Sequence, residues 1–516
     1  MKSETSDFRL QTSQLRLDEY LPPRSLWPTL VRRLPSLQYP GTVNLAEELL
    51  AAAGRSPLST AIVCRGERVS YRDLRERTLS AAGALTRLGV EPADRVALRF
   101  YNTPDFIVAW LAVQWVGAIG VPIPPIYRRR EIEHIVGHSG ATFVIAAPDL
   151  AADVEAAARG RSSHSIRIVT GLSDGVVPPP PYPTPGDGPA LITYVTSATG
   201  APQGVVHSPA ELLATADTYA SDVLDLSARD ICIGSPTMAW SFGLGGLLVF
   251  PFRVGASTVL VDPSGQPLPA LIAGTRATVL FAVPTVYRLL LRQPDFESYD
   301  FTSLRCCISA AEPLAATVVE EWRARTGLEI LDGLGTTALA HIFISARSGS
   351  VRPGSIGRVV AGYEARIVDD DSRELPSGVP GQLAVRGPTG ARYWRDAEAQ
   401  ASVVRDGWTL TGDVCTSQAD GSFVHIRRTD DLIVSGGYKI SPREVERALC
   451  DHPEVESACV FAVSDPVRGA VPHATVTLRP PAESAGVMDR LQRYLKQELA
   501  PYKCPRVIQV APGNPR

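Results

Sequence analysis

The sequence predicts an α/β fold in which helices and strands pack in layers around a largely parallel sheet. The first observation is a capping-box pattern over residues 70–73, followed by apolar positions at helical spacing and a glycine at position 89. The second is residues 95–100, which alternate in polarity as a strand does. The third is that helix-like and strand-like segments keep alternating through residues 142–147, which is typical of α/β layers. The positions at helical spacing in the first helix are Leu74, Thr78, Ala81, Leu85 and Leu88.

Composition and charge exclude several classes of function. The chain has 516 residues, of which 45% are hydrophobic, enough for one large and one small domain or for three domains. Its net charge of −3, with both signs mixed, argues against nucleic-acid binding and against a basic membrane-binding face. The eight cysteines form no Cys-x-x-Cys pair and the N-terminus has no apolar core, so we expect a cytoplasmic protein without a signal peptide.

Residues 106–125 are apolar enough to suggest a membrane span. The stretch is interrupted by Gln114, Gly117 and Gly120 and ends in Val-Pro-Ile-Pro-Pro. A buried helix that leads into a buried strand explains this pattern better. We therefore expect no membrane association.

A candidate phosphate-binding loop occupies residues 196–204, Thr-Ser-Ala-Thr-Gly-Ala-Pro-Gln-Gly, after a strand-like apolar run. Small residues and glycines after a strand leave backbone N–H groups able to face an anion. Thr196, Ser197 and Thr199 add hydroxyl donors, and Gly200 follows them. Gln203 carries no charge to offset a polyphosphate. An ordinary Ser/Thr/Gly turn is the alternative.

This loop resembles the phosphate loop of the adenylate-forming superfamily, which contains acyl-CoA synthetases, peptide-synthetase adenylation domains and luciferases. The family's loop reads Thr-Ser-Gly-(Ser/Thr)-Thr-Gly-x-Pro-Lys-Gly. Here the loop is one residue shorter, with Ala198 in place of a glycine and Gln203 in place of the lysine. The resemblance implies that the loop binds nucleotide phosphate through Thr196, Ser197, Thr199 and Gly200.

Two later segments, residues 309–313 and 332–338, match the family's adenine and α-phosphate site. The resemblance implies that Glu312 and Asp332 bracket the base and that Thr337 hydrogen-bonds the phosphate. The family's metal-binding glutamate follows that threonine, and here the position is Ala338. The remaining residues assigned to this site are Pro313, Gly333, Leu334 and Gly335.

The pattern Gly333-x-Gly335-x-x-Ala338 also formally matches the glycine motif of dinucleotide-binding folds. We reject that interpretation, because the motif lies in the middle of the chain and no acidic residue follows about twenty positions later to hold a ribose.

Residues 407–413 match the family's ribose-binding motif, and residues 427–431 match its hinge. Asp413 would accept two hydrogen bonds from the ribose diol, because a carboxylate offers several acceptor sites. Arg428 would meet ribose or phosphate, and Asp430 would be the pivot. A turn and a surface ion pair are the alternatives.

After the hinge, residues 441–444 form a capping-box pattern with proline at the first helical position. The resemblance implies that the preceding glycine loop, Gly436 and Gly437, faces the active site when the small domain rotates. With Tyr438, this loop would form the channel for the pantetheine arm of CoA. Lys439 would meet a CoA phosphate, with a solvated lysine as the alternative.

Residues 238–261 and 281–285 resemble the segments that line the acyl pocket in the benzoate–CoA-ligase-like branch of the family. The candidates are Trp240, Phe242 and Ala282, together with Gly335, and simple core packing is the alternative. Several small residues among them would leave room for an aromatic or bulky polycyclic acyl group.

The order of the motifs implies two domains, an AMP-binding region over residues 1–429 and a small mobile lid over residues 430–516. A last amphipathic helix is predicted from Met488, Leu491, Leu495 and Leu499. The sequence stops before the family's Thr-x-Thr-Gly-Lys motif, and a trimmed sequence is one explanation.

Adenylation needs positive charge around a pentavalent phosphate. The loop lysine, the magnesium-binding glutamate and the final lysine are all missing, whereas the thioester-forming parts are present. We therefore predict an acyl-CoA ligase that only transfers the acyl group of a preformed acyl-adenylate to coenzyme A. It would need no Mg²⁺ or other metal, and a separate adenylating enzyme, as in secondary metabolism, would supply its substrate. The alternatives are a complete ATP-dependent acid–CoA ligase and a catalytically inactive nucleotide-binding relative.

Overall fold

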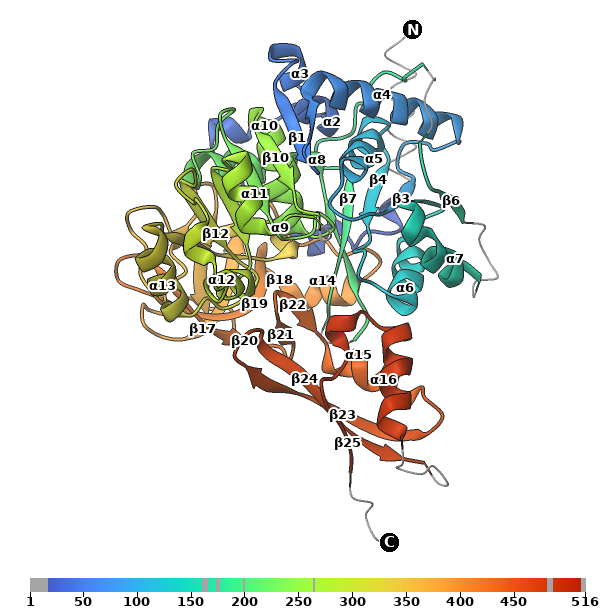
Figure 1. Ribbon diagram of the computed structural model, residues 1–516, viewed down its shortest axis with the longest axis vertical. Helices are drawn as coiled ribbons and strands as arrows, with labels where there is room; N and C mark the ends of the chain where they lie inside the picture. Colours follow the sequence, from blue (N-terminus) through green and yellow to red (C-terminus); the bar gives the residue numbers. More distant parts are fainter. Residues whose placement is uncertain are drawn as a thin grey trace.

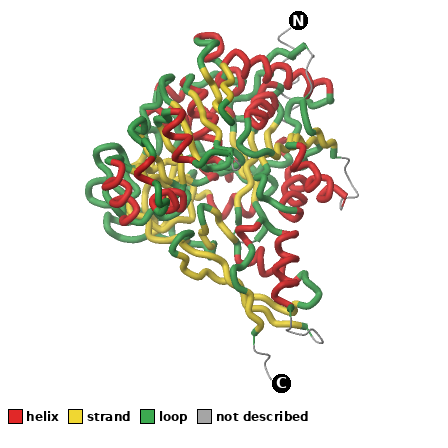
Figure 2. The backbone as a smooth tube through the Cα atoms, in the orientation of Figure 1, coloured by secondary structure: helices red, strands yellow, loops and turns green. Residues whose placement is uncertain are grey.

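The computed structural model describes residues 17–159, 166–172, 177–197, 200–262, 265–479 and 486–511. It is a mixed α/β protein with a large N-terminal part and a small C-terminal part, as predicted (Figure 1). Figure 2 shows strands running through the interior of the large part with helices around them. None of the described helices combines the length and the apolar character needed to cross a bilayer.

The largest sheet has nine strands, and the six consecutive strands from β13 to β1 pair in parallel. Helices α11 (Leu268–Thr275), α12 (Pro284–Leu291) and α13 (Ala316–Thr326) connect strands of this sheet. The strands in spatial order are β15 (Arg358–Val359), β14 (Ile342–Ser345), β13 (Ile330–Gly335), β12 (Cys306–Ser309), β11 (Val279–Ala282), β9 (Ile231–Gly234), β10 (Ser257–Leu260), β1 (Thr60–Cys64) and β2 (Glu67–Ser70).

The second sheet has six strands and carries the candidate phosphate loop at one edge. The strands in spatial order are β6 (Arg167–Val169), β5 (Phe143–Ala146), β3 (Arg95–Arg99), β4 (Ile119–Pro122), β7 (Leu191–Val195) and β8 (Gln203–His207). Strands β7 and β8 pair antiparallel, with Val195 opposite Gln203, so the loop is the connection of a hairpin. The helices of this region are α4 (Tyr71–Arg87), α5 (Pro104–Trp115), α6 (Arg129–Ser139), α7 (Ala151–Arg159) and α8 (Pro209–Thr215).

The local predictions for this region are confirmed. Ser70 caps α4 and forms a capping box with Asp73, which fixes the start of the helix. Residues 106–125 fall on α5 and the buried strand β4, so their apolar character reflects burial in the core. Strand β13 ends in a 3₁₀ turn, η7 (Thr337–Leu339), where a dinucleotide-binding motif would open an α-helix.

Two smaller sheets follow, and the chain passes from one to the other between Arg428 and Ile433. The first contains β16 (Glu364–Val368), β17 (Gly381–Arg386), β18 (Val404–Arg405), β19 (Trp408–Ser417) and β20 (Phe423–Arg428). The second contains β21 (Ile433–Ser435), β22 (Tyr438–Ile440), β23 (Val455–Asp465), β24 (Gly469–Leu478) and β25 (Ile508–Val510). Helices α15 (Pro442–Cys450) and α16 (Val487–Glu498) accompany this last sheet at the lower end of the molecule in Figure 1.

Two details of the C-terminal part differ from prediction. Ser441 caps α15 by accepting from the Glu444 N–H at 3.4 Å, but the Glu444 carboxylate bonds Lys503 at 2.7 Å in place of completing the capping box. In α16, Leu491 and Leu495 are buried, whereas Met488 is 49% exposed and does not belong to the apolar face.

Candidate functional site

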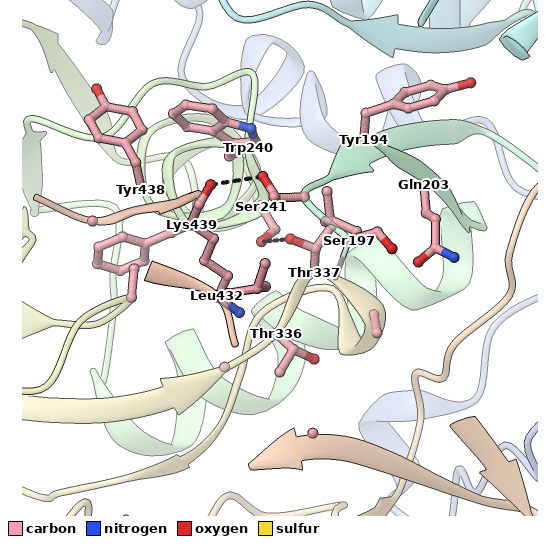
Figure 3. Close-up of a pocket in the computed structure, with 18 of the residues that line it drawn as sticks. Tyr194, Ser197, Gln203, Trp240, Ser241, Thr336, Thr337, Leu432, Tyr438 and Lys439 are labelled. Carbon is pink, nitrogen blue, oxygen red and sulfur yellow. Dashed lines mark hydrogen bonds between the residues drawn. The ribbon is translucent and has the colours of Figure 1, made fainter. Parts of the chain in front are cut away.

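A cavity of about 910 Å³ lies where the two parts of the chain meet. Its wall combines the ends of β7 and β13, the segment around α9 (Ser241–Leu244), helix α14 (Ala397–Val403), the β19–β20 region and the turn between β21 and β22. Segments that lie far apart in the sequence therefore form one site (Figure 3).

The phosphate-loop residues lie in this wall and touch the C-terminal part. Thr196 and Ser197 line the cavity, and Thr196 Oγ1 donates to the Lys439 carbonyl at 2.9 Å. Gly200 has φ +94°, and a Cβ there would lie 3.2 Å from the Glu444 nitrogen, so glycine suits both the backbone and the space. The predicted contributor Thr199, like Ala198, lies outside the described residues.

Gln203 is engaged with a carboxylate. Its Nε2 donates to Asp396 Oδ2 at 3.0 Å, while Asp396 Oδ1 accepts from the Ala399 N–H at 2.8 Å and caps α14. Both residues line the cavity. The side chain at the family's lysine position therefore neutralises no charge and bonds an acidic group.

The position of the family's metal-binding glutamate is an apolar contact. Ala338 lines the cavity and packs against a small cluster that includes Val205 and Tyr393. Within the described ranges, no three His, Cys, Asp or Glu side chains gather as a metal site. Mg²⁺ prefers carboxylate oxygens, which Ala338 lacks, whereas the carboxylates of Asp396 and Glu398 line the cavity elsewhere.

Thr337 is placed as predicted, at the cavity wall. Its Oγ1 lies 3.4 Å from Ser241 Oγ, and the neighbouring Thr336 Oγ1 is buried with no hydrogen-bond partner in the part of the chain that the structure describes (Figure 3). A buried hydroxyl without a partner is unfavourable, so a ligand oxygen here would gain a hydrogen bond.

The adenine-site prediction is only partly met. Gly335 lines the cavity, but Glu312 does not, because its carboxylate accepts from Thr285 Oγ1 at 2.9 Å and from Arg288 at 2.8 Å. Asp332 is also absent from the wall, and burial raises its pKa to about 7. The other assigned residues absent from the wall are Pro313, Gly333 and Leu334.

The ribose-motif carboxylate is buried and half satisfied. Asp413 Oδ1 accepts from Arg428 at 3.0 Å and lies 3.2 Å from His425 Nε2, whereas Oδ2 is buried and has no hydrogen-bond partner among the described residues. Burial alone would raise the pKa of Asp413, but the His425 hydrogen bond and the Arg428 charge hold it below its usual value. The free Oδ2 is the kind of acceptor that a ribose hydroxyl would satisfy.

The hinge residues form an ion pair next to that carboxylate. Arg428 donates to both Asp430 oxygens, at 2.9 and 2.6 Å, and both residues line the cavity. The bidentate geometry is the strong form of such a pair. Arg428 therefore connects the ribose motif to the predicted pivot.

Lys439 points into the cavity beside Leu432 (Figure 3). Burial lowers its pKa to about 8, and the positive charge of Arg428 adds to this effect. None of the described residues forms an ion pair with its ammonium group. Lys439 is thus a half-buried residue of the cavity wall, and its contact with a CoA phosphate stays a prediction.

The glycine turn packs against the N-terminal part. Gly436 and Gly437 have φ values of +57° and +83°, and a Cβ at Gly437 would lie 3.1 Å from Val283. The next residue, Tyr438, meets the Trp240 ring edge-on with centroids 5.3 Å apart. The slim turn predicted from sequence thus closes over the cavity.

The apolar end of the cavity contains the two predicted aromatic residues, Trp240 and Phe242, and one residue that sequence reasoning missed. Phe242 lies 6.0 Å from the Phe281 ring and 5.8 Å from the His341 ring. His341 lines the cavity, and burial lowers the pKa of its ring to about 3, so it is neutral. Ala282 was wrongly assigned, because it faces the core from β11, and Val283 lines the cavity in its place.

Comparison with known proteins identifies the family. Residues 49–394 match the model for the AMP-binding enzyme family, and residues 444–516 match that for the AMP-binding enzyme C-terminal domain. The chain belongs to the AMP-binding enzymes. Within them, it is similar to the benzoate–CoA ligase of Thauera aromatica, with 32% identity over 93% of this chain and 95% of that protein. It is also similar to the anthranilate–CoA ligase of Pseudomonas aeruginosa, with 33% identity over 88% and 90%.

Solved structures of AMP-binding enzymes share this architecture. The anthranilate CoA ligase AuaEII in complex with anthranoyl-AMP has a TM-score of 0.74 and 29% identity, covering 94% of this chain and 96% of that one. The amide bond synthetase McbA of Marinactinospora thermotolerans has a TM-score of 0.82 and 26% identity, covering 92% and 97%. The protein is an acyl-CoA ligase of the benzoate–CoA-ligase-like branch.

Proposed function

We propose that this AMP-binding enzyme performs the thioester-forming half of the ligase reaction, from a preformed acyl-adenylate and CoA. The observation that carries the proposal is the pair of neutral side chains at the phosphate end of the site. Gln203 bonds Asp396 and Ala338 packs against apolar residues, so neither supplies a cation or a metal ligand. Losing one preorganised charge contact typically costs about 10²–10³ in rate.

The groups that thioester formation requires lie in the cavity wall or directly behind it. Asp413, which is buried behind the wall residue Arg428, would offer Oδ2 to the ribose, and Arg428 and Lys439 in the wall bring positive charge for the phosphate of AMP. In this step the CoA sulfur forms a bond to the acyl carbonyl carbon and the bond from that carbon to the phosphate oxygen breaks. The thiol proton passes to solvent, and AMP leaves as an anion that these cations stabilise.

The complete ATP-dependent acid–CoA ligase is the second candidate, and the comparisons favour it over the first. The relatives from Thauera aromatica and Pseudomonas aeruginosa are called benzoate–CoA and anthranilate–CoA ligases, with no restriction to one half of the reaction. In that case Mg²⁺ would be bound by groups other than a side chain at Ala338. A catalytically inactive nucleotide-binding protein is a third outcome.

The proposal also covers the class of carboxylic acid, the source of the adenylate and the movement of the two domains. We propose an aromatic or bulky polycyclic acid, because Trp240, Phe242 and His341 line the apolar end of the cavity. A separate adenylating enzyme, in a secondary-metabolic pathway in the cytoplasm, would supply the adenylate. We also propose that residues 430–516 rotate on residues 1–429 about Asp430, which follows the last strand of one sheet.

One paired assay tests these candidates. Purified protein is incubated with CoA and synthetic benzoyl-, anthraniloyl- or feruloyl-AMP and, in parallel, with the free acids, ATP and Mg²⁺. Acyl-CoA in the first arm without acid-dependent ATP–pyrophosphate exchange in the second supports the thioester-only function. Exchange with any acid establishes the complete ligase and overturns the main proposal. If neither acyl-CoA nor pyrophosphate exchange is detected, the result supports a catalytically inactive nucleotide-binding protein.

A further inference from the structure

A buried charge cluster joins the two parts of the chain outside the adenylate site. Lys503 Nζ, in η8 (Pro501–Lys503), lies 3.1 Å from Glu131 Oε1 of α6 and 2.7 Å from Glu444 Oε1 of α15. The three side chains are 1%, 0% and 11% exposed. Burial lowers the pKa of Lys503, but the charges of Glu131 and Glu444 more than reverse this, so the ammonium stays charged.

Glu131 is shared between the two parts. It accepts from the Arg128 N–H at 2.9 Å at the start of its own helix, and from the Ala500 N–H at 2.8 Å in the C-terminal part. If the C-terminal part moved away, this carboxylate would lose the Ala500 N–H and the Lys503 ammonium. Breaking a buried ion pair by removing one partner is strongly unfavourable, so the cluster favours the observed arrangement.

A chain of aromatic contacts connects the cluster to the cavity. The Lys503 ammonium lies 5.2 Å from the Tyr127 ring centroid and 5.9 Å from that of Tyr502. Tyr502 stacks on Tyr438 at 4.2 Å, and Tyr438 meets Trp240 edge-on at 5.3 Å. Tyr127 also meets Trp240 edge-on, at 6.2 Å, which closes the path. All four aromatic residues line the cavity.

We propose that Glu131 and Lys503 are positioning residues for acyl transfer to CoA. Their ion pair holds Tyr502, Tyr502 holds Tyr438, and Tyr438 sets the Gly436–Gly437 turn against the N-terminal part. The inference rests on CoA-thioester formation, which both leading candidate functions share. Placement of this turn matters for the thiol, because a misplacement of about 1 Å can cost about 10²-fold in rate.

A matched control lies on the same two elements. Arg130 of α6 pairs with Asp451, next to the end of α15, at 2.6 Å, and Asp451 is half exposed. This pair also bridges the two parts but makes no contact with Tyr438, Tyr502 or Trp240 in the described structure. Asp451→Asn therefore tests whether any bridging charge has the same effect.

The experiment compares full-length Glu131→Gln, Lys503→Met, the double variant and Asp451→Asn. We expect kcat for conversion of the aryl-AMP panel and CoA to acyl-CoA to fall about 10- to 100-fold in the first three, with AMP affinity by calorimetry within about twofold of the parent. The control should keep the parent kcat. The double variant leaves the Glu444 carboxylate buried without Lys503, whereas Glu131→Gln keeps the Lys503–Glu444 pair, so Glu131→Gln is the variant that separates positioning from folding.

Hydrogen exchange supplies a readout that does not depend on turnover. Amides of residues 433–440 should exchange faster in the three cluster variants and at the parent rate in Asp451→Asn. Folded cluster variants with the parent kcat and parent exchange would overturn the proposal, as would an equal effect in the control. If the parent itself makes no acyl-CoA, the thioester function fails, and the exchange measurement alone decides the positioning role.

Discussion

Thr196 Oγ1 donates a 2.9 Å hydrogen bond to the backbone carbonyl of Lys439, which ties the phosphate loop to strand β22 of the C-terminal part. The hydroxyl of the first residue in the loop therefore donates its hydrogen bond to a strand of the C-terminal part. Gly200, farther along the same loop, packs against the start of α15. The phosphate end of the cavity is therefore built jointly by the two parts of the chain, and this arrangement makes several predictions.

Asp413→Ala should weaken AMP binding by about 1.5–3 kcal/mol, the usual worth of hydrogen bonds to a charged group. The free Oδ2 would no longer be present to accept from the ribose. Titration calorimetry with AMP measures the change. His425→Ala, which removes a neighbour of Oδ1 only, is the control and should have a smaller effect. Unchanged affinity in Asp413→Ala would remove this residue from the ribose site.

Asp430→Pro should slow acyl transfer to CoA while AMP affinity stays near that of the parent. Proline fixes φ and would restrict rotation at the proposed pivot. Asp430→Ala controls for loss of the ion pair with Arg428. The rates are measured with aryl-AMP substrates and CoA. If both variants lose rate equally, the effect belongs to the ion pair and Asp430 is not a pivot.

Gln203→Lys and Ala338→Glu should each fail to produce ATP–pyrophosphate exchange, because each restores only one of the charges that act on the same transition state. The double variant should show a low but measurable exchange with Mg²⁺. Acyl transfer from aryl-AMP to CoA serves as the control for folding. Strong ATP–pyrophosphate exchange in either single variant would show that one missing charge is enough to explain the loss of adenylation.

Affinity for AMP should fall as the pH rises through about 8. The pKa of Lys439 is lowered to about 8, so the ammonium is charged below that pH and neutral above it. An anionic phosphate is stabilised by the charged form, with Asp413, Asp430 and Arg428 as the neighbouring charges. Calorimetry between pH 7 and 9 measures the loss. Lys439→Met should bind weakly at every pH, and a parent-like pH dependence in this variant would exclude Lys439.

Phe242→Ala should shift acid preference toward larger acyl groups. The ring lies between Phe281 and His341, so its removal enlarges the apolar end of the cavity. Competition between benzoyl-AMP and a larger aryl-AMP for CoA measures the ratio of kcat/KM values, which we expect to change about 10-fold or more. A constant ratio would place the acyl group elsewhere in the cavity.

Much of the fold could be predicted because its signals are local. The cap at Ser70 and the apolar run over α5 and β4 depend on neighbouring residues, and both predictions are confirmed. Ala282 was misassigned because the face that a short buried strand turns to the cavity is set by its neighbours in the sheet. Glu312 was misassigned because its partners, Thr285 and Arg288, come from another element.

The residues that sequence analysis missed were also missed because their contacts are with distant parts of the chain. His341 belongs to no sequence motif. Its place in the cavity wall depends on contacts with the aromatic rings of Phe242 and Phe250, which come from distant parts of the chain. The Lys503 cluster joins residues about 370 positions apart, such as Ala500 and Glu131. A single sequence gives no signal for such contacts, whereas a motif of consecutive residues, such as the one that contains the ribose carboxylate, can be found in the sequence itself.

The shared use of Arg428 has a thermodynamic consequence. One guanidinium bonds both Asp413, the proposed ribose carboxylate, and Asp430, the proposed pivot, so under this proposal nucleotide occupancy and domain orientation depend on the same interactions. If bound AMP favours one domain orientation by a given factor, then by thermodynamic linkage that orientation raises the affinity for AMP by the same factor. A substitution of Arg428, which would break both contacts at once, should therefore change AMP affinity and domain orientation together, and AMP affinity becomes a direct gauge of how the C-terminal part is oriented.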